Sequence, residues 1–321
     1  MATAGNAETE ISLTTRTRRL GADDVVVVEL ESADGQPLPE WEPGAHIDLC
    51  LPDDVTRQYS LCGDPADRTV YRVGVLRDAN GRGGSKYVFD NIRENDSVTV
   101  RGPRNHFPFL PSSRYIFIAG GIGITPILPM ITAAMNAGAQ WELHYGGRTR
   151  SSMSFVEELT SLPGDHVILY PQDEVGLIDL GKILDTPVPG TLVYSCGPGP
   201  LLEAVEARTS NWPTNSVHVE RFEPKVLETV AGDDSFEIEL AESGMVLTVP
   251  SEKSVLQVLE EADVEVYSSC QDGTCGTCET PVISGEVNHR DSIMSPGEQA
   301  ANDRMYVCVS RASCSRLVLG I

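Results

Sequence analysis

The hydrophobic pattern of the first third of the chain consists of short runs separated by turn residues. Between Val25 and Gly102 these runs are VVVVEL, HIDLCL, RQYSL, VYRVGVL and SVTVRG. Alternating or continuous apolar runs of this length, rich in β-branched residues, are typical of strands. Because most of these runs have no segment of helical periodicity between them, they predict an antiparallel β-barrel or β-sandwich.

The pattern changes after Tyr115, where strand-like runs alternate with helical stretches up to Phe222. The runs are YIFIAG, WELHYGG, HVILYP, TLVYSCG and SVHVERF. Regular alternation of this kind predicts an α/β domain with a doubly wound parallel sheet. After the polar stretch EPKVLETVAGDDS, FEIEL and MVLTV predict strands and SVLQVLEEA predicts a helix capped by Ser254, so a small α+β domain follows.

These changes in the hydrophobic pattern divide the chain into three predicted domains: residues 1–110, 111–224 and 225–321, with a linker at about 223–234. A length of 321 residues with 40% hydrophobic and 22% charged residues fits a folded multidomain protein. The 47 acidic residues outnumber the 24 basic ones, which argues against nucleic acid or an anionic membrane as partner. The amino terminus MATAGNAETE has no targeting pattern, so we expect a cytoplasmic protein, and a monomer.

Four cysteines in the last domain carry the most specific signal. Cys270, Cys275 and Cys278 lie in CQDGTCGTC, and Cys308 follows in RMYVCVS. The spacing C-x4-C-x2-C with a distant fourth cysteine is that of plant-type ferredoxins, whose thiolates hold a 2Fe-2S cluster. The glycines between the cysteines allow a tight loop that brings backbone N–H groups near the cluster sulfurs.

Two alternatives apply to these cysteines. A tetrathiolate zinc site usually has two C-x2-C pairs, and the second pair is missing here. Cys314 could replace Cys308 as the fourth ligand, but it lies in a polar segment, whereas Cys308 ends a strand-like run. Cys50 and Cys62 are interpreted as ordinary small residues, as is Cys314.

The segment IAGGIGITPILPM predicts a nucleotide site in the middle domain. A strand, a glycine run and then a helix place a pyrophosphate at a helix N-terminus, with Thr125 as the predicted N-cap. A tight structural turn is the alternative for this motif alone. A second loop, YSCGPGP, reaches the same sheet edge, and together the loops favour a dinucleotide. The residues involved are Gly120, Gly121 and Gly123 in the first loop and Cys196, Gly197 and Pro198 in the second.

A flavin is expected in the first domain, because hydride donors deliver electrons in pairs and clusters accept them singly. RQYSL offers Arg57 for a phosphate, Tyr59 as an aromatic wall and Ser60 as a hydrogen-bond partner for a ring nitrogen, with Gln58 between them. A second anion-binding turn precedes a predicted helix and contains Gly83, Gly84 and Ser85. Each motif alone could be an ordinary hairpin or loop, but their order along the chain favours the flavin.

In this order the motifs resemble the phthalate dioxygenase reductase family, which includes the reductase components of vanillate demethylases. The resemblance covers nearly everything after residue 15. It implies a β-barrel fold for the flavin domain and a β-grasp, ferredoxin-like fold for the last domain. It also implies FMN as the flavin and main-chain contacts to the flavin ring from Gly74, Val75 and Leu76. It also implies that Thr125 lies near flavin and nicotinamide, Cys196 near the hydride path and Phe222 near the flavin face. Ser60 and Cys196 are therefore the candidate catalytic residues.

The choice between NADH and NADPH stays open at the sequence level. The strand WELHYGG is followed by Arg148, Arg150, Ser151 and Ser152, where NADH enzymes commonly have an acidic residue and NADPH enzymes have arginine or serine. The arginines could equally be solvated surface charges. We expect NADH, with NADPH as the alternative and Arg148 as a candidate contact.

The sequence therefore predicts an oxidoreductase that passes electrons from NAD(P)H through FMN and a 2Fe-2S cluster to a separate terminal oxygenase. By resemblance that oxygenase is a Rieske non-haem iron oxygenase or demethylase acting on an aromatic compound, or a cytochrome P450. Two other classes remain open. One is a stand-alone reductase of a small acceptor such as a quinone, and the other is a redox sensor.

Overall fold

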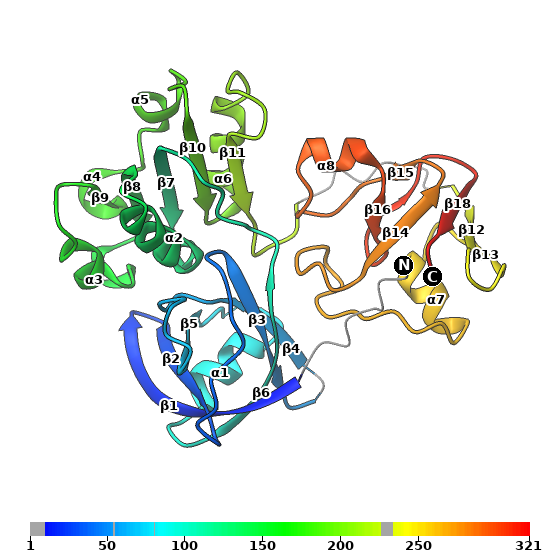
Figure 1. The fold of residues 1–321 in the computed structure, drawn as a ribbon, viewed down its shortest axis with the longest axis horizontal. Coiled ribbons are helices and arrows are strands. Elements are labelled where there is room, and N and C mark those ends of the chain that lie inside the picture. The colour runs from blue at the N-terminus through cyan, green and yellow to red at the C-terminus, as the bar shows by residue number, and fades with distance from the viewer. Residues whose placement is uncertain (1–9, 54, 80, 226–233) are drawn as a thin grey trace. The chain divides into compact units, whose positions relative to one another are not determined.

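The computed structural model describes residues 10–53, 55–79, 81–225 and 234–321. The chain divides into two compact units, Met1–Glu220 and Arg221–Ile321, and each is described by itself (Figure 1). Most of the predicted linker lies outside the described residues. No helix in the described part of the chain is long and apolar enough to cross a membrane.

The first unit begins with a six-stranded antiparallel sheet in the order β4-β3-β6-β1-β2-β5. A bridge between Leu61 and Val73 joins the end of β4 to β5 and closes the sheet into a barrel. The predicted barrel is confirmed. Its elements are β1 (Glu10–Ala22), β2 (Val25–Ser32), β3 (Ala45–Leu51), β4 (Val55–Ser60), β5 (Val70–Leu76), α1 (Gly84–Asn91) and β6 (Ser97–Asn105).

The second half of this unit is a five-stranded parallel sheet in the order β11-β10-β7-β8-β9, as predicted. Because all strands are parallel, their carboxyl ends meet at one edge. The elements are β7 (Arg114–Gly120), η1 (Gly121–Gly123), α2 (Ile124–Asn136), β8 (Gln140–Gly147), η2 (Arg150–Ser152), α3 (Val156–Thr160), β9 (Val167–Pro171), α4 (Gln172–Val175), α5 (Leu180–Leu184), β10 (Thr191–Cys196), α6 (Gly199–Arg208) and β11 (Val217–Glu220).

The start of α2 differs from the prediction. Gly123, and not Thr125, is the N-cap, and no side chain caps this helix. The glycine turn η1 runs directly into α2, so Thr125 is already inside the helix and its hydroxyl donates to the Ile122 carbonyl at 2.9 Å. The first N–H groups of the helix consequently have no side-chain cap, which suits an anion at this end.

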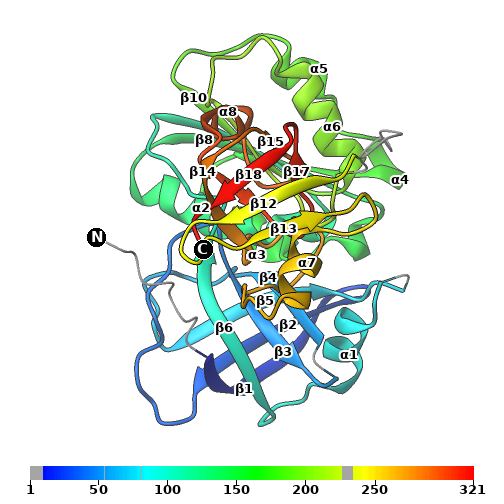
Figure 2. The ribbon, with the colours of Figure 1, turned by 90° about the vertical axis from the view of Figure 1, so that its right-hand side faces the viewer.

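The second unit is a small α+β domain of the predicted β-grasp kind. Its main sheet has the order β13-β12-β18-β14-β16, and Figure 2 shows β12 between β13 and β18. Ser254 caps α7 through a reciprocal capping box with Gln257, as predicted. The elements are β12 (Phe236–Leu240), β13 (Val246–Val249), α7 (Val255–Glu261), β14 (Glu279–Ser284), β15 (Val287–Asn288), α8 (Pro296–Ala301), β16 (Arg304–Tyr306), β17 (Arg311–Ala312) and β18 (Arg316–Leu319).

Candidate functional site

Strand β4 carries the predicted flavin motif. Ser60 is buried at its carboxyl end, where it pairs with His46 of β3. The Gln58 amide donates to Asp48 Oδ1 at 2.9 Å, so its side chain is held against β3. The buried hydroxyl of Tyr59 has no hydrogen-bond partner among the described residues, and burial raises its pKa. A buried polar atom of this kind fits a bound polar ligand.

The predicted phosphate turn lies beside this strand. Gly83 has φ 88° and precedes α1, whose first residue is Gly84. A Cβ at Gly84 would stand 2.5 Å from Arg57 Cγ and 2.8 Å from Arg57 Nε, so only glycine lets the arginine lie across the helix start. The Ser85 hydroxyl accepts from the Asp78 N–H at 3.1 Å. An arginine laid over a helix N-terminus forms a cradle suited to a phosphate.

Strand β5 brings the barrel against the α/β half of the unit. A Cβ at Gly74 would stand 2.9 Å from Thr125 Cγ2 and 3.4 Å from the Phe155 ring. Nearby, Arg72 forms an ion pair with Glu158 at 2.9 Å and lies over the Phe155 ring. Gly74 and Thr125, predicted from separate motifs, are thus in contact. Val75 is buried, while Leu76 is 41% exposed at the strand end.

The two predicted nucleotide loops also meet at the carboxyl edge of the parallel sheet. A Cβ at Gly120 would lie 2.7 Å from Pro198 Cδ, and one at Gly197 would lie 3.0 Å from Gly120. A Cβ at Gly123 would lie 2.3 Å from the Cys196 carbonyl oxygen. Gly121 has φ 54°, and its carbonyl accepts from the Tyr145 hydroxyl at 3.1 Å. Glycine is therefore required for the close approach of these two backbones.

Cys196 faces an acidic residue that sequence reasoning missed. Its fully buried thiol donates to Glu220 Oε2 across 3.9 Å, at the adjacent carboxyl ends of β10 and β11. Burial raises the pKa of the Glu220 carboxyl to about 8, although the residue as a whole stays partly exposed. Burial, followed by the nearby carboxylate, also raises the pKa of the Cys196 thiol. Both shifts favour the neutral, protonated forms near pH 7. The sequence signal for it was an acid at the end of the strand-like run SVHVERF.

This raised pKa predicts a pH-dependent contribution of Glu220 to stability. A carboxyl whose pKa is higher in the folded than in the unfolded chain binds more protons when folded. Its stabilising contribution is complete below about pH 4.5 and is lost as the pH rises toward about 8. We expect the melting temperature of the wild type to fall relative to Glu220→Gln by a few degrees over this range. Thermal melts from pH 5 to 9 measure it, and Glu203→Gln, at an exposed position on α6, should show no such trend.

Two other predicted residues lie apart from these contacts. Arg148 is exposed directly after β8. Phe222, at the start of the second unit, is 43% exposed. Their roles toward a nucleotide and a flavin stay predictions.

In the second unit, the cysteine loop has the tight geometry that its glycines predict. Gly273 has φ 68° and Gly276 has φ 76°. The sulfur of Cys270 accepts from the N–H groups of Asp272 at 3.3 Å and Thr274 at 3.5 Å. All four predicted cysteines are buried. Backbone N–H groups directed at a cysteine sulfur stabilise its thiolate, the form that binds iron.

The four thiols approach one another in two pairs. The hydrogen bond from Cys275, together with those from the backbone, lowers the pKa of Cys270 to about 5 despite burial. The hydrogen bond from Cys308 to Cys278, with burial and the nearby charge of Cys270, raises the pKa of Cys308. Within the described residues, no group of three or more His, Cys, Asp or Glu side chains is arranged to hold a single metal ion. Two pairs of thiols fit a binuclear cluster, in which each iron takes two thiolates.

Cys314 lies in a different setting. Its sulfur accepts from the Glu286 N–H at 3.2 Å and donates to the Arg316 carbonyl at 3.1 Å. Both partners are backbone groups, one between β14 and β15 and the other at the first residue of β18. The alternative in which Cys314 replaces Cys308 therefore has less support than the set with Cys308.

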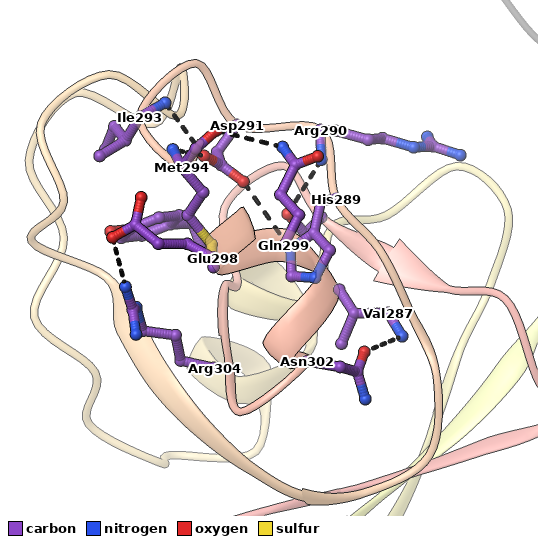
Figure 3. Close-up of polar contacts among 12 residues, drawn as sticks. Val287, His289, Arg290, Asp291, Ile293, Met294, Glu298, Gln299, Asn302 and Arg304 are labelled. Carbon is purple, nitrogen blue, oxygen red and sulfur yellow. Dashed lines mark hydrogen bonds and ion pairs between the residues drawn. The ribbon is translucent and has the colours of Figure 1, made fainter. Parts of the chain in front are cut away.

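A neighbouring segment around Asp291 contacts the cysteine loop, and Figure 3 shows the polar contacts within that segment. The buried Asp291 accepts from the N–H groups of Ile293 at 3.0 Å and Met294 at 2.7 Å. The next residue, Ser292, donates its N–H to the Gly273 carbonyl at 2.9 Å. A Cβ at Gly273 would lie 3.2 Å from the Asp291 Cα. Asp291 therefore fixes the segment on which the cysteine loop rests.

We expect Asp291→Ala to weaken the cysteine loop. Removing the carboxylate leaves one buried and one partly buried N–H group without their acceptor, at a cost of about 1–3 kcal/mol. Asp291→Asn keeps an acceptor oxygen and should lose much less. The measurement is the rate at which visible cluster absorbance decays in air, together with the melting temperature. Asp303→Ala, at a position 60% exposed, is the control, and equal decay rates for it and Asp291→Ala would contradict the supporting role.

Comparison with known proteins agrees with this arrangement. Residues 117–207 match the oxidoreductase NAD-binding domain family, and residues 238–313 match the 2Fe-2S iron-sulfur cluster binding domain family. The toluene-4-sulfonate monooxygenase system reductase subunit TsaB1 of Comamonas testosteroni is 40% identical over 317 residues, covering 97% of this chain and 99% of its own.

Two solved structures extend the likeness. Phthalate dioxygenase reductase, described as a modular structure for electron transfer from pyridine nucleotides to [2Fe-2S], is 36% identical with a TM-score of 0.70, over 97% of this chain and 98% of its own. An intact type IV self-sufficient cytochrome P450 monooxygenase is 42% identical with a TM-score of 0.92 over 97% of this chain. This chain spans only 41% of that protein.

The predicted fold class and the predicted resemblance are thus confirmed, and the chain has an NAD-binding domain and a 2Fe-2S cluster-binding domain. Relatives matched over nearly their whole length include reductase subunits of oxygenase systems. The chain belongs to the phthalate dioxygenase reductase family of oxidoreductases.

Proposed function

We propose that this protein is the reductase component of a multicomponent oxygenase, with NADH, FMN and a 2Fe-2S cluster as its redox groups. The observation that carries the proposal is the contact between Gly74 of the barrel and Thr125 of the nucleotide domain. It sets the strand beside the flavin motif against the helix that follows the glycine loop. A nicotinamide and a flavin held at this junction would lie close together, which hydride transfer requires.

The residues divide into three groups by role. Arg57 and the turn around Gly84 bind the flavin phosphate, while Tyr59 and Ser60 orient the ring. The loops at Gly120 and Gly197 hold the dinucleotide, and Cys196 with the protonated Glu220 forms an uncharged end to that site. The four paired cysteines hold the cluster. When bound, the flavin supplies the conversion of an electron pair into single electrons, and the cluster carries them onward.

The partner is a terminal oxygenase, because relatives are named as reductase subunits of monooxygenase and dioxygenase systems. We propose a Rieske non-haem iron oxygenase or demethylase of aromatic compounds, with a cytochrome P450 as the second candidate because of the fused relative. The acidic balance, 47 acidic against 24 basic residues, favours docking on a basic surface of this partner. A monomeric, cytoplasmic protein fits this role.

An anaerobic visible spectrum before and after stoichiometric NADH tests the proposal, with extraction to distinguish FMN from FAD. Flavin bands over a broad iron-sulfur absorption, both bleached by NADH, are expected. A protein without iron after anaerobic preparation would contradict the cluster assignment. Steady NADH oxidation by a quinone without any oxygenase would favour a small-acceptor reductase, and absence of flavin bleaching by either nucleotide would favour a redox sensor.

A further inference from the structure

The loop after β8 lies where nucleotide-binding sheets distinguish NADH from NADPH. In such sheets a carboxylate near the end of the second strand binds the ribose hydroxyls, whereas an arginine nearby accommodates the 2′-phosphate. The segment GGRTRSSM, which ends β8 and continues past it, contains arginines and serines but no acid. The neighbouring parallel strand β9 ends at Pro171 and is followed by Asp173 and Glu174 in α4. Carboxylates therefore lie at the corner formed by the carboxyl ends of β8 and β9, although the loop after β8 has none.

Arg150 and Glu174 form a two-point ion pair across this corner. Arg150 Nε donates to Glu174 Oε1 at 3.2 Å, and Arg150 Nη2 donates to Oε2 at 2.9 Å. The side chains are 52% and 45% exposed, so an incoming ligand can reach them. A 2′-phosphate would need the same guanidinium edge, because two parallel N–H donors suit a phosphate as well as a carboxylate.

The hydroxyl groups of this loop are also engaged. Ser151 Oγ donates to Asp23 Oδ2 at 2.5 Å, and Ser152 Oγ donates to the Thr149 carbonyl at 2.8 Å. Asp173 follows the same strand, and its N–H donates to the Arg148 carbonyl at 3.3 Å. Around this loop there are thus three acidic residues, Asp23, Asp173 and Glu174, and two basic ones, Arg148 and Arg150, and the charged groups of Glu174 and Arg150 are paired. A phosphate monoester carries close to two negative charges at pH 7, so this balance disfavours it.

We propose that Glu174 is a specificity-determining residue that keeps the nucleotide site selective for NADH, because it occupies Arg150 and adds a negative charge where the 2′-phosphate of NADPH would bind. The proposal rests on the function proposed above. It assigns the selectivity to a residue on the strand after the one where an acid is usually found. Arg150 then has the chemistry to bind a phosphate, but its guanidinium is occupied by the ion pair with Glu174.

The test compares four forms of the full-length protein: wild type, Glu174→Gln, Glu174→Gln with Arg150→Gln, and Glu157→Gln. Glu157 lies at an exposed position on α3, so its variant removes an equal charge from the same half of the unit. Steady-state kcat/KM for ferricyanide reduction is measured with NADH and with NADPH. Equilibrium binding of NAD+, NADP+ and adenosine 2′,5′-bisphosphate is measured by calorimetry, independently of turnover.

We expect Glu174→Gln to raise kcat/KM for NADPH about fivefold to tenfold and to tighten binding of adenosine 2′,5′-bisphosphate by a similar factor, both more so at low salt. NADH values should stay within about twofold. The gain should be absent from Glu157→Gln and from the double variant, since the double variant lacks the guanidinium.

Unchanged NADPH values with NADH oxidation intact would overturn the role of Glu174 and leave the proposed function standing. Weaker NADH binding without any NADPH gain would also overturn it, because Glu174 would then bind the ribose itself. A wild type that oxidises neither nucleotide would overturn the proposed function and, with it, this inference.

Discussion

Cys275→Ser should remove the visible absorption of the cluster and reduce electron delivery to a one-electron acceptor such as cytochrome c by more than about a hundredfold. Cys275 is 1% exposed and its thiol is hydrogen-bonded to Cys270, so the substitution removes one of the two sulfurs in that pair. A serine hydroxyl is not ionised at neutral pH and is a much poorer ligand for a cluster iron than a thiolate. NADH-dependent bleaching of the flavin should persist, because none of the residues predicted to bind the flavin or the nucleotide lies in the cysteine loop. All of those residues except Phe222 lie in the other unit.

Cys314→Ser is the matched control for this substitution. The sulfur of Cys314 contacts backbone groups of Glu286 and Arg316, and its loss should leave the iron content and acceptor reduction unchanged. Iron analysis, visible spectra and stopped-flow reduction by NADH distinguish the variants. If Cys314→Ser lost the cluster and Cys275→Ser kept it, the assigned ligand set would be wrong. Loss of flavin bleaching in a folded Cys275→Ser protein would instead contradict the linear order of the redox groups.

The fold was predictable from sequence where the strands are apolar, and less so where they are polar. Strand β1 spans Glu10–Ala22, yet ISLTTRTRRLGA has few apolar residues and was not predicted as a strand. Its buried positions include Leu13 and the polar Thr15, because hydrogen bonding to β2 and β6 on both sides holds it in the sheet. Pairing between distant segments supplies a stabilisation that a local hydrophobic pattern does not reveal.

The candidate site shows the same division. Motifs with fixed spacing, such as the cysteines and the glycine loops, could be found in the sequence because their chemistry depends on neighbouring residues. Glu220 and Glu174 could not, because their roles depend on what the next parallel strand brings beside them. An acid at the end of a strand or shortly after it is common, and the partners Cys196 and Arg150 distinguish these two.

Gly123→Ala should disable the nucleotide site while sparing the rest of the protein. A Cβ at Gly123 would stand 2.3 Å from the Cys196 carbonyl oxygen and 2.7 Å from the Gly197 nitrogen, and both atoms are backbone. The φ of Gly123 is −62°, which alanine adopts readily, so the effect is a clash without backbone strain. The two loops must separate, and a displacement near 1 Å at a reactive site can lower the rate by about a hundredfold. We expect a loss of that size in kcat/KM for NADH.

Gly199→Ala is the matched control. Gly199 lies close to Cys196 and Gly197 in the second loop, yet no atom lies within 4 Å of a Cβ built on it. Its kcat/KM should stay within about twofold of wild type, since alanine is favourable at the start of α6. Overpacking at Gly123 should also cost about 1–3 kcal/mol of unfolding free energy, which thermal melts report. Reduction of the flavin by dithionite bypasses the nucleotide, so electron delivery from the reduced protein should be normal in Gly123→Ala. If NADH oxidation were unimpaired in that variant, the close approach of the two loops would not be needed for nucleotide binding, and the dinucleotide would have to bind elsewhere on the sheet edge.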